Sequence, residues 1–196
     1  MTYVQTIEPR LTPLRPVAPS GAAEVVAEWC WDLDAELGAR LGLVSPEDLA
    51  WQPHPDANSA GVTAWHVARW LDVLGTRAFT GRPAEADLWH TEGWKDRTGY
   101  EPDGIGYLGL GTLTGYTPGE MRAVPLLSGG ELRAYLGQAS ARLTEQIAEL
   151  GAGLVGGEHP EHSPYSTITG TLQGSFGHVG EFDALVSLRS RLAGPA

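Results

Sequence analysis

The sequence predicts an all-α protein in which four amphipathic helices pack around one core. Apolar residues recur every three or four positions in four separate stretches, and no stretch alternates apolar with polar residues as a strand does. The chain has 196 residues, a length typical of a single domain with one sizeable core. Together these observations favour a four-helix bundle.

An extended arm is expected before the first helix, because residues 1–19 contain four prolines. Residues 20–196 then form the bundle domain. The first helix is predicted from about Gly21 to Leu43, and Pro46 helps to end it. Its apolar stripe consists of Val26, Trp29, Cys30, Leu33, Leu37 and Leu41.

The second helix is predicted from about residue 59 to residue 79. Asn58 or Ser59 can cap it, because side-chain oxygens of these residue types accept hydrogen bonds from the free amides at a helix start. The helical period directs one set of side chains inward, and this set includes Val62, His66 and Val73.

A long irregular loop is predicted from about Pro83 to Pro125, where glycines and aromatic residues follow no sustained period. A connection of this length inside a domain usually carries function or covers something. The third helix then begins at a capping box formed by Ser128 and Glu131 and ends at Gly151. Its apolar side consists of Leu132, Tyr135, Leu136, Leu143 and Ile147.

The fourth helix is predicted from about residue 166 to residue 192, with an apolar stripe of Leu172, Phe176, Val179, Phe182 and Val186. It also contains Gly170, Gly174, Gly177 and Gly180. Each interior glycine costs a helix about 1 kcal/mol relative to alanine, so something must compensate. Close helix packing is the commoner explanation. The alternative is that Gly174 and Ser175 leave room for a ligand beside His178.

Charge and composition exclude several classes of function. The formal net charge of −11 disfavours binding to a nucleic acid or to an anionic membrane surface. No apolar run approaches the ~20 residues of a membrane span, and prolines interrupt the N-terminus where a signal peptide would be apolar. A cytoplasmic location is therefore expected. The single cysteine, Cys30, excludes an intramolecular disulfide and is interpreted as a core residue.

Two motifs are interpreted as structural. Gly104, Gly106 and Gly109 form a G-x-G-x-x-G pattern, but neither the strand nor the helix of a dinucleotide site flanks it. His159 and His162 form an H-x-x-H pair beside a proline, and a solvated loop explains them better than metal ligation.

The two most informative residues are His66 and His178, because the helical period directs both toward the bundle interior from different helices. Metal sites in helix bundles are built from side chains on facing helices. The competing interpretation is a pair of core histidines that hydrogen-bond to neighbouring helices.

Two segments around these histidines carry a family resemblance. The first, LAWQPHPDANSAGVTAWHVARWLD, resembles the DinB/YfiT-like superfamily signature, in which W-x-P and Asn-Ser lead into W-H-x-A-R-x-x-D. The second, HVGEFDALVSLRSRL, resembles that superfamily's last-helix H-x-G-(E/Q) followed by L-R-x-L. The resemblance implies an up-down-down-up bundle, often dimeric, with a divalent metal (Zn, Ni or Mn) held by three side chains in a central pocket.

Carried over position by position, the resemblance makes His66 the first metal ligand and His178 the last. The remaining ligand, one turn before the last, falls at Gly174, which offers no ligand atom. Glu181, three residues after His178, could replace it, could orient a histidine, or could pair with Arg69. A ligand from the middle loop, such as His90, is another alternative.

Two functional hypotheses follow. The first is a metal-dependent enzyme, a thiol-dependent transferase or isomerase or a hydrolase, acting on a small molecule or thiol. In it, the pocket beside the metal is lined by Trp89, His90, Trp94, Gly174 and Ser175. The second is a metal-free protein that binds a small ligand or serves a stress response after losing the third metal ligand. Gly174 motivates this second hypothesis.

Overall fold

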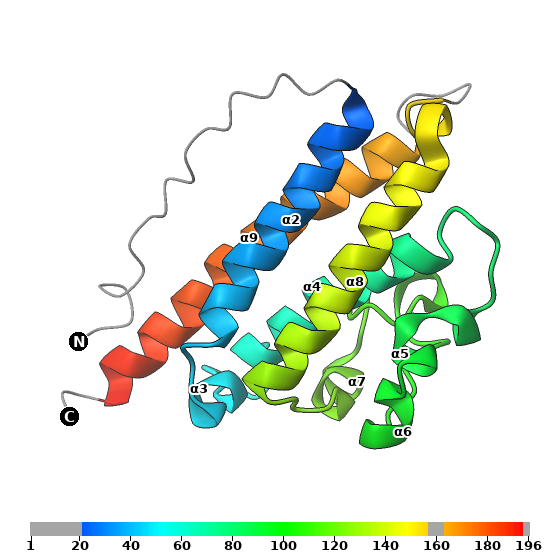
Figure 1. The fold of residues 1–196 in the computed structure, drawn as a ribbon. Coiled ribbons are helices and arrows are strands. Elements are labelled where there is room, and N and C mark those ends of the chain that lie inside the picture. The colour runs from blue at the N-terminus through cyan, green and yellow to red at the C-terminus, as the bar shows by residue number, and fades with distance from the viewer. Residues whose placement is uncertain (1–20, 157–162, 194–196) are drawn as a thin grey trace.

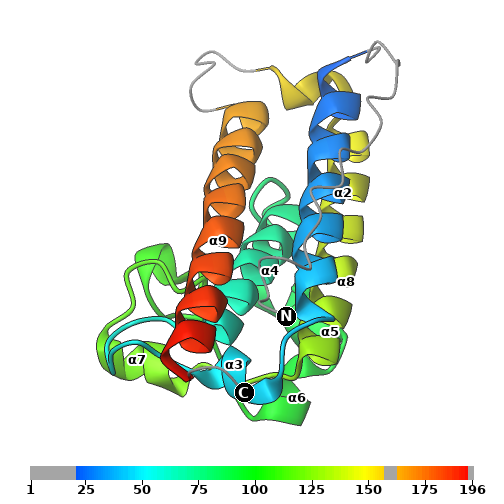
Figure 2. The same cartoon turned by 90° about the vertical axis from the view of Figure 1, so that its left-hand side faces the viewer.

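A computed structural model describes residues 21–156 and 163–193, and these residues contain helices and no strand. The predicted all-α class is therefore confirmed. Four long helices dominate the structure (Figure 1): α2 (Ala22–Leu41), α4 (Ala60–Thr76), α8 (Gly129–Leu150) and α9 (Pro164–Ala193). Helices α2 and α9 run in one direction, and α4 and α8 run in the other (Figures 1 and 2). No helix of the described residues has the length and apolar character that crossing a membrane would require.

Helix starts follow the caps encoded in the sequence. Ser59 caps α4 by accepting a hydrogen bond from the amide of Val62, at 3.2 Å. Ser128 and Glu131 form the reciprocal capping box at the start of α8. A cap of this kind stabilises a helix by about 1 kcal/mol, so these residues define where α4 and α8 begin.

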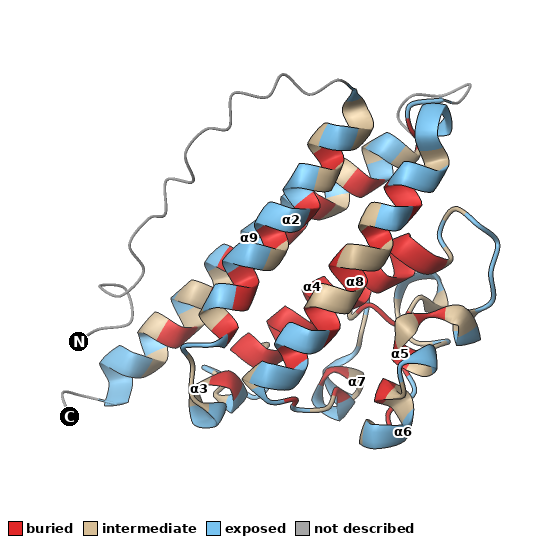
Figure 3. Cartoon of the chain, viewed as in Figure 1, coloured by how far each residue is buried: buried red, intermediate tan, exposed pale blue. Residues whose placement is uncertain are grey.

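Helix α4 lies at the centre of the fold and is enclosed on all sides. Every one of its residues except Trp70 is buried, and most of the α4 ribbon has the colour of buried residues in Figure 3. It packs so closely on α8 that a side chain at Gly75 would place its Cβ 2.7 Å from the backbone nitrogen of Leu143. This position therefore requires glycine.

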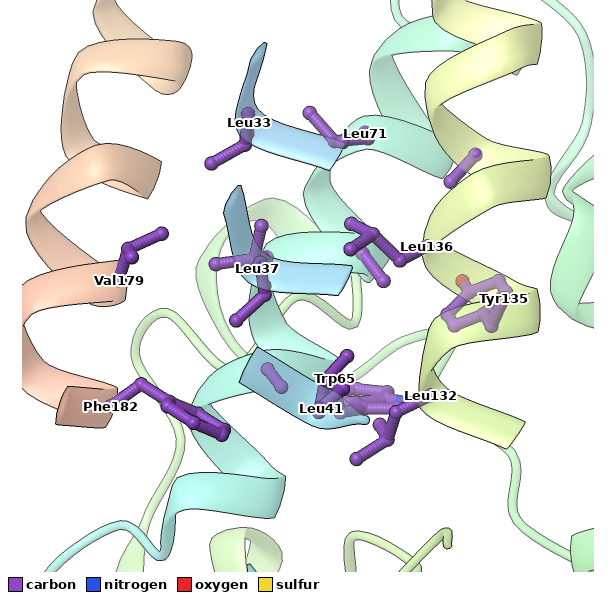
Figure 4. Close-up of a cluster of buried hydrophobic side chains, with 14 of the residues drawn as sticks. Leu33, Leu37, Leu41, Trp65, Leu71, Leu132, Tyr135, Leu136, Val179 and Phe182 are labelled. Atoms are coloured by element: carbon purple, nitrogen blue, oxygen red, sulfur yellow. The ribbon is translucent and has the colours of Figure 1, made fainter. Parts of the chain in front are cut away.

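The core lies between the four long helices, which contribute leucines and aromatic rings to it (Figure 4). The predicted apolar stripes are buried, with two exceptions. Trp29 on α2 and Phe176 on α9 are 41% and 37% exposed, because they line one groove between α2 and α9 at the surface rather than the core. Cys30 is buried in the core as expected.

The connections contain short helices that the sequence pattern did not reveal. Pro46 begins α3 (Pro46–Ala50) in addition to following α2. The 83–125 segment, predicted to be irregular, contains five short elements separated by turns. These are η1 (Ala84–Ala86), α5 (Leu88–Thr91), α6 (Trp94–Thr98), η2 (Tyr107–Gly109) and α7 (Pro118–Ala123); one more turn, η3 (Gly151–Leu154), follows α8.

The G-x-G-x-x-G pattern lies in this middle segment, as a tight loop around η2. Gly104, Gly106 and Gly109 all have positive φ, a conformation that favours glycine. No strand precedes the loop in the described part of the chain, so the dinucleotide interpretation has no structural support.

Candidate metal site and its pocket

The two predicted histidines meet in the interior. His66 comes from α4 and His178 from α9, and the centroids of their rings are 4.7 Å apart at an interplanar angle of 87°. His66 is 7% exposed, whereas the side chain of His178 is 34% exposed. The site therefore extends from the core to the surface.

The Nδ1 atom of each ring is held by a neighbouring acceptor. Nδ1 of His66 bonds to the backbone carbonyl of Thr112, and Nδ1 of His178 lies 2.8 Å from a carboxylate oxygen of Glu181. A carbonyl can only accept, so Nδ1 of His66 carries the proton and Nε2 carries the lone pair. Within the described residues, Nε2 of neither ring has a hydrogen-bond partner. Metal-binding histidines are commonly anchored in this way.

Burial sets the protonation state of His66. Its pKa is lowered to about 4, mainly by removal from water and also by nearby His178, against the opposing effects of the Thr112 carbonyl and Glu181. The hydrogen bond from His178 lowers the pKa of Glu181, which is therefore an anion near neutral pH. The site thus combines a neutral imidazole with a carboxylate.

A pocket of about 320 Å³ opens beside the two rings. Its polar groups come from Asn58, Thr114 and Tyr116, and its apolar wall comes from Leu113 and Met121. Neither lysine nor arginine is among its lining residues. The pocket therefore suits a small, partly apolar molecule that carries few negative charges.

Glu181 orients His178, one of the three roles that its sequence position allowed. The proposed ion pair with Arg69 is wrong, because Arg69 is fully buried elsewhere among Asp72 at 2.9 Å, Asp87 at 2.7 Å and Asp103 at 3.2 Å. Whether Glu181 also binds a metal stays a prediction.

Sequence reasoning missed this ion network around Arg69. One signal was available: Arg69 and Asp72 lie three residues apart on a helix whose other inward residues, His66 apart, are apolar or small. Charged residues are rarely buried unless they are paired, so this spacing indicates a local pair. The partners Asp87 and Asp103 belong to the middle segment, and no sequence pattern placed them beside α4.

Trp89 and Trp94 do not line the histidine pocket, contrary to expectation. They are 0% and 2% exposed and pack against each other and against Trp65, Tyr100 and Tyr135. The physical reason is the large apolar area of these rings, which is worth more in the core than at an opening.

His90 contacts Asp103 at 2.7 Å and Glu101 at 3.6 Å rather than either site histidine. These three residues have the spacing of a metal site. However, Arg69 and Arg77 already neutralise Asp103, and Lys95 pairs with Glu101. The carboxylates of this cluster therefore already have cationic partners and are less available to a metal.

Gly174 and Ser175 lie outside the pocket lining as well. Ser175 is buried, whereas Gly174 is exposed, and a Cβ at Gly174 would meet nothing within 4 Å. The same is true of Gly170, Gly177 and Gly180. Within the described residues, these glycines therefore do not serve close helix packing, which corrects the commoner expectation. His159 and His162 lie outside the described residues.

Comparison with known proteins identifies the family of this chain. The family model described as the DinB superfamily matches residues 32–181, a range that contains both site histidines and Glu181. No curated protein matches the chain. The matched range covers well over half of the sequence, and the chain belongs to the DinB superfamily.

Proposed function

We propose that this protein is a metal-dependent enzyme that binds a divalent cation through Nε2 of His66 and Nε2 of His178. One observation carries the proposal: two imidazoles from different helices stand side by side at a pocket, each anchored through Nδ1 and each with a free Nε2. Imidazole nitrogens suit zinc and nickel, whereas manganese would need oxygen ligands in addition at the coordination positions left open. A bound cation of this kind lowers the pKa of a water or thiol or polarises a carbonyl.

The roles of the surrounding residues follow from their positions. Thr112 and Glu181 hold the two rings in orientation, and burial keeps His66 neutral so that its lone pair is available. Asn58 and Tyr116 offer hydrogen bonds to a substrate, while Leu113 and Met121 contact its apolar part. We propose a thiol-dependent transferase or isomerase, or a hydrolase, acting on a small molecule.

Gly174 favours a second candidate function. With glycine at the position where the superfamily places a third ligand, only two imidazoles remain, and three protein ligands are usual for zinc. In this alternative, the protein binds a small ligand, or acts in a stress response, without metal. The pocket beside the histidines would then hold the ligand directly.

Metal content decides between the two candidates. Untagged protein purified without added metal is analysed by elemental mass spectrometry, together with His66→Ala, His178→Ala and the control His54→Ala, whose side chain is 70% exposed. The enzyme proposal expects about one metal per chain in the native protein and the control, and none in the two site variants. Absence of metal after incubation with zinc, nickel and manganese would favour the metal-free candidate.

We also propose that the chain has the superfamily's up-down-down-up bundle and forms a homodimer. The first half of α9, from Tyr165 to Gly180, contains no aspartate, glutamate, lysine or arginine, although the chain carries −11 overall. Two acidic chains repel each other least across such a face. Light scattering of the native protein and of Phe176→Glu tests this, since an unchanged mass for the variant would place the interface elsewhere.

A further inference from the structure

Three consecutive backbone carbonyls of the middle segment accept hydrogen bonds from α4 and the residue that caps its end. Arg77 donates to the carbonyl of Leu110 at 3.0 Å, Arg69 donates to that of Gly111 at 3.3 Å, and His66 donates to that of Thr112. We call Leu110, Gly111 and Thr112 the carbonyl segment. His66 thus belongs to a row of donors that together hold this segment against α4.

The carbonyl segment depends on the backbone of Gly111. Its φ of +66° lies in the left-handed region, and a Cβ there would clash with the carbonyl oxygen of Pro102. Successive carbonyls of an extended chain point to opposite sides. The left-handed conformation of Gly111 interrupts this alternation. The carbonyls of Leu110, Gly111 and Thr112 can then all accept hydrogen bonds from side chains on the same side.

Arg69 fixes the carbonyl segment from the interior. Its guanidinium is fully buried and donates to Asp72, Asp87 and Asp103 while its Nε donates to Gly111. Asp87 and Asp103 precede the carbonyl segment along the chain, so a single side chain ties three points of the middle segment to α4. Only the planar fork of arginine presents donors in enough directions to do this.

Asp72 also holds the middle segment against α4, as a hydrogen-bond acceptor. It accepts hydrogen bonds from the amides of Leu88 and Trp89 at 2.8 and 3.0 Å and from the hydroxyl of Tyr135 at 2.8 Å. Well-packed apolar residues often stabilise a fold as much as a buried ion network does. Stability alone therefore does not explain why charged rather than apolar residues are buried between α4 and the middle segment.

We propose that Arg69 is a positioning residue for the histidine site: it holds the carbonyl segment so that Thr112 keeps the proton of His66 on Nδ1 and leaves Nε2 free toward the pocket. The metal-binding consequence rests on the proposed function, whereas the effect on the His66 ring does not. Arg69 itself touches neither substrate nor metal in this scheme.

The experiment measures the His66 ring directly. In ¹⁵N-labelled protein without metal, long-range imidazole spectra report which ring nitrogen carries the proton. The native protein is expected to show His66 with the proton on Nδ1. In Arg69→Lys, which keeps the charge but lacks the fork, the ring is expected to become a mixture of tautomers. Zinc affinity is expected to fall about 10–100-fold, as when other partners that orient a metal ligand are lost.

Two further variants separate positioning from general loss of stability. Gly111→Ala distorts the carbonyl segment while Arg69 is intact, and it is expected to reproduce the tautomer mixture. Leu143→Ala opens the fully buried core between α4 and α8, and it is expected to lower stability while the proton of His66 stays on Nδ1.

The results for these variants distinguish the positioning role of Arg69 from the proposed metal-dependent function. A native-like His66 ring and native zinc affinity in folded Arg69→Lys would overturn the inference. If Arg69→Lys does not fold, an unchanged ring in Gly111→Ala would overturn it. A native protein that binds no zinc, but whose His66 ring changes in both variants, would leave the positioning role standing and refute the metal-dependent function.

Discussion

The buried imidazole of His66 is expected to make the free energy of unfolding fall as the pH drops from about 6.5 to about 4. Burial lowers the pKa of His66 from 6.5 to about 4 in the folded protein, whereas the unfolded chain keeps the ordinary value. Between these two values the unfolded chain binds more protons than the folded protein does, so acid favours unfolding. Above about pH 6.5 both forms are neutral, and this contribution is constant.

The size of the effect follows from the two pKa values. Their difference is roughly 2.5 units, and one unit corresponds to about 1.36 kcal/mol, so the folded protein loses about 3 kcal/mol through this group between neutral pH and pH 4. A protein of this size typically has a free energy of unfolding of about 5–15 kcal/mol. The loss is therefore a large fraction of the total and is measurable.

Urea unfolding followed by circular dichroism, in the presence of a chelator, measures this dependence at several pH values between about 7 and 4.5. The native protein is compared with His66→Gln, whose amide can still donate to the Thr112 carbonyl but does not titrate in this range. Other acidic groups titrate in both proteins, so the difference between the two curves isolates His66. The exposed His54→Gln serves as the control and should follow the native curve.

Parallel curves for the native protein and His66→Gln would refute the reasoning. They would mean that His66 either stays accessible to water or finds a compensating anion when it is protonated. A difference that instead grows as the pH falls from about 6.5 would agree with a buried, neutral imidazole.

The remaining predictions concern glycines and a cap. Gly174→Ala should raise the free energy of unfolding by about 1 kcal/mol in urea titrations, since its Cβ meets nothing within 4 Å; a loss would reveal a hidden contact. Gly174→His should supply a third ligand at the position where the resemblance implies one and tighten zinc binding in calorimetry by about tenfold or more, unless the added ring faces away from His178. Gly75→Ala should cost about 1–3 kcal/mol by crowding α8, and a neutral result would show that α4 and α8 can separate freely. Ser128→Ala should cost about 1 kcal/mol in thermal or urea unfolding through the lost cap; no change would mean that tertiary packing alone holds the start of α8.

The long helices could be predicted from the sequence because their signals are local. The helical period and the caps at Ser59 and Ser128 are readable within a few residues, and the observed helices begin and end within about three residues of the expected positions. Trp29 and Phe176 could not be placed in the same way. Periodicity assigns them to the apolar side, but only the packing of α2 against α9 decides which residues at the edge of that side stay exposed.

The short helices of the middle segment escaped prediction for a physical reason. Helices such as α5 and α6 have four and five residues, fewer than two turns, so no period can develop in them. Isolated helices of this length are unstable in water. They persist here because Trp89 and Trp94 are buried against Tyr135 of α8. Their stability comes from contacts between residues that are far apart in the sequence.

The two histidines of the site could be predicted from the sequence, but not all of the groups that orient them. The inward direction of His66 and His178 follows from the period, and their meeting follows from the packing of α4 against α9. The groups that orient the rings differ in this respect. Glu181 lies one turn from His178 on the same helix, so its role was among those proposed. The Thr112 carbonyl lies 46 residues from His66 along the chain, and no local pattern connects the two.

The middle segment supplies what a helix bundle cannot supply to its own buried polar groups. Inside a helix, each backbone carbonyl already accepts a hydrogen bond from the residue four positions later, so neighbouring helices offer few free acceptors to a buried His66 or Arg69. Turns with left-handed glycines, such as Gly111, leave carbonyls available. Since α4 is enclosed on all sides, its polar residues need such a segment beside them. The same loop that satisfies Arg69 therefore also fixes the ring of His66, which joins the stability of this fold to the geometry of its site.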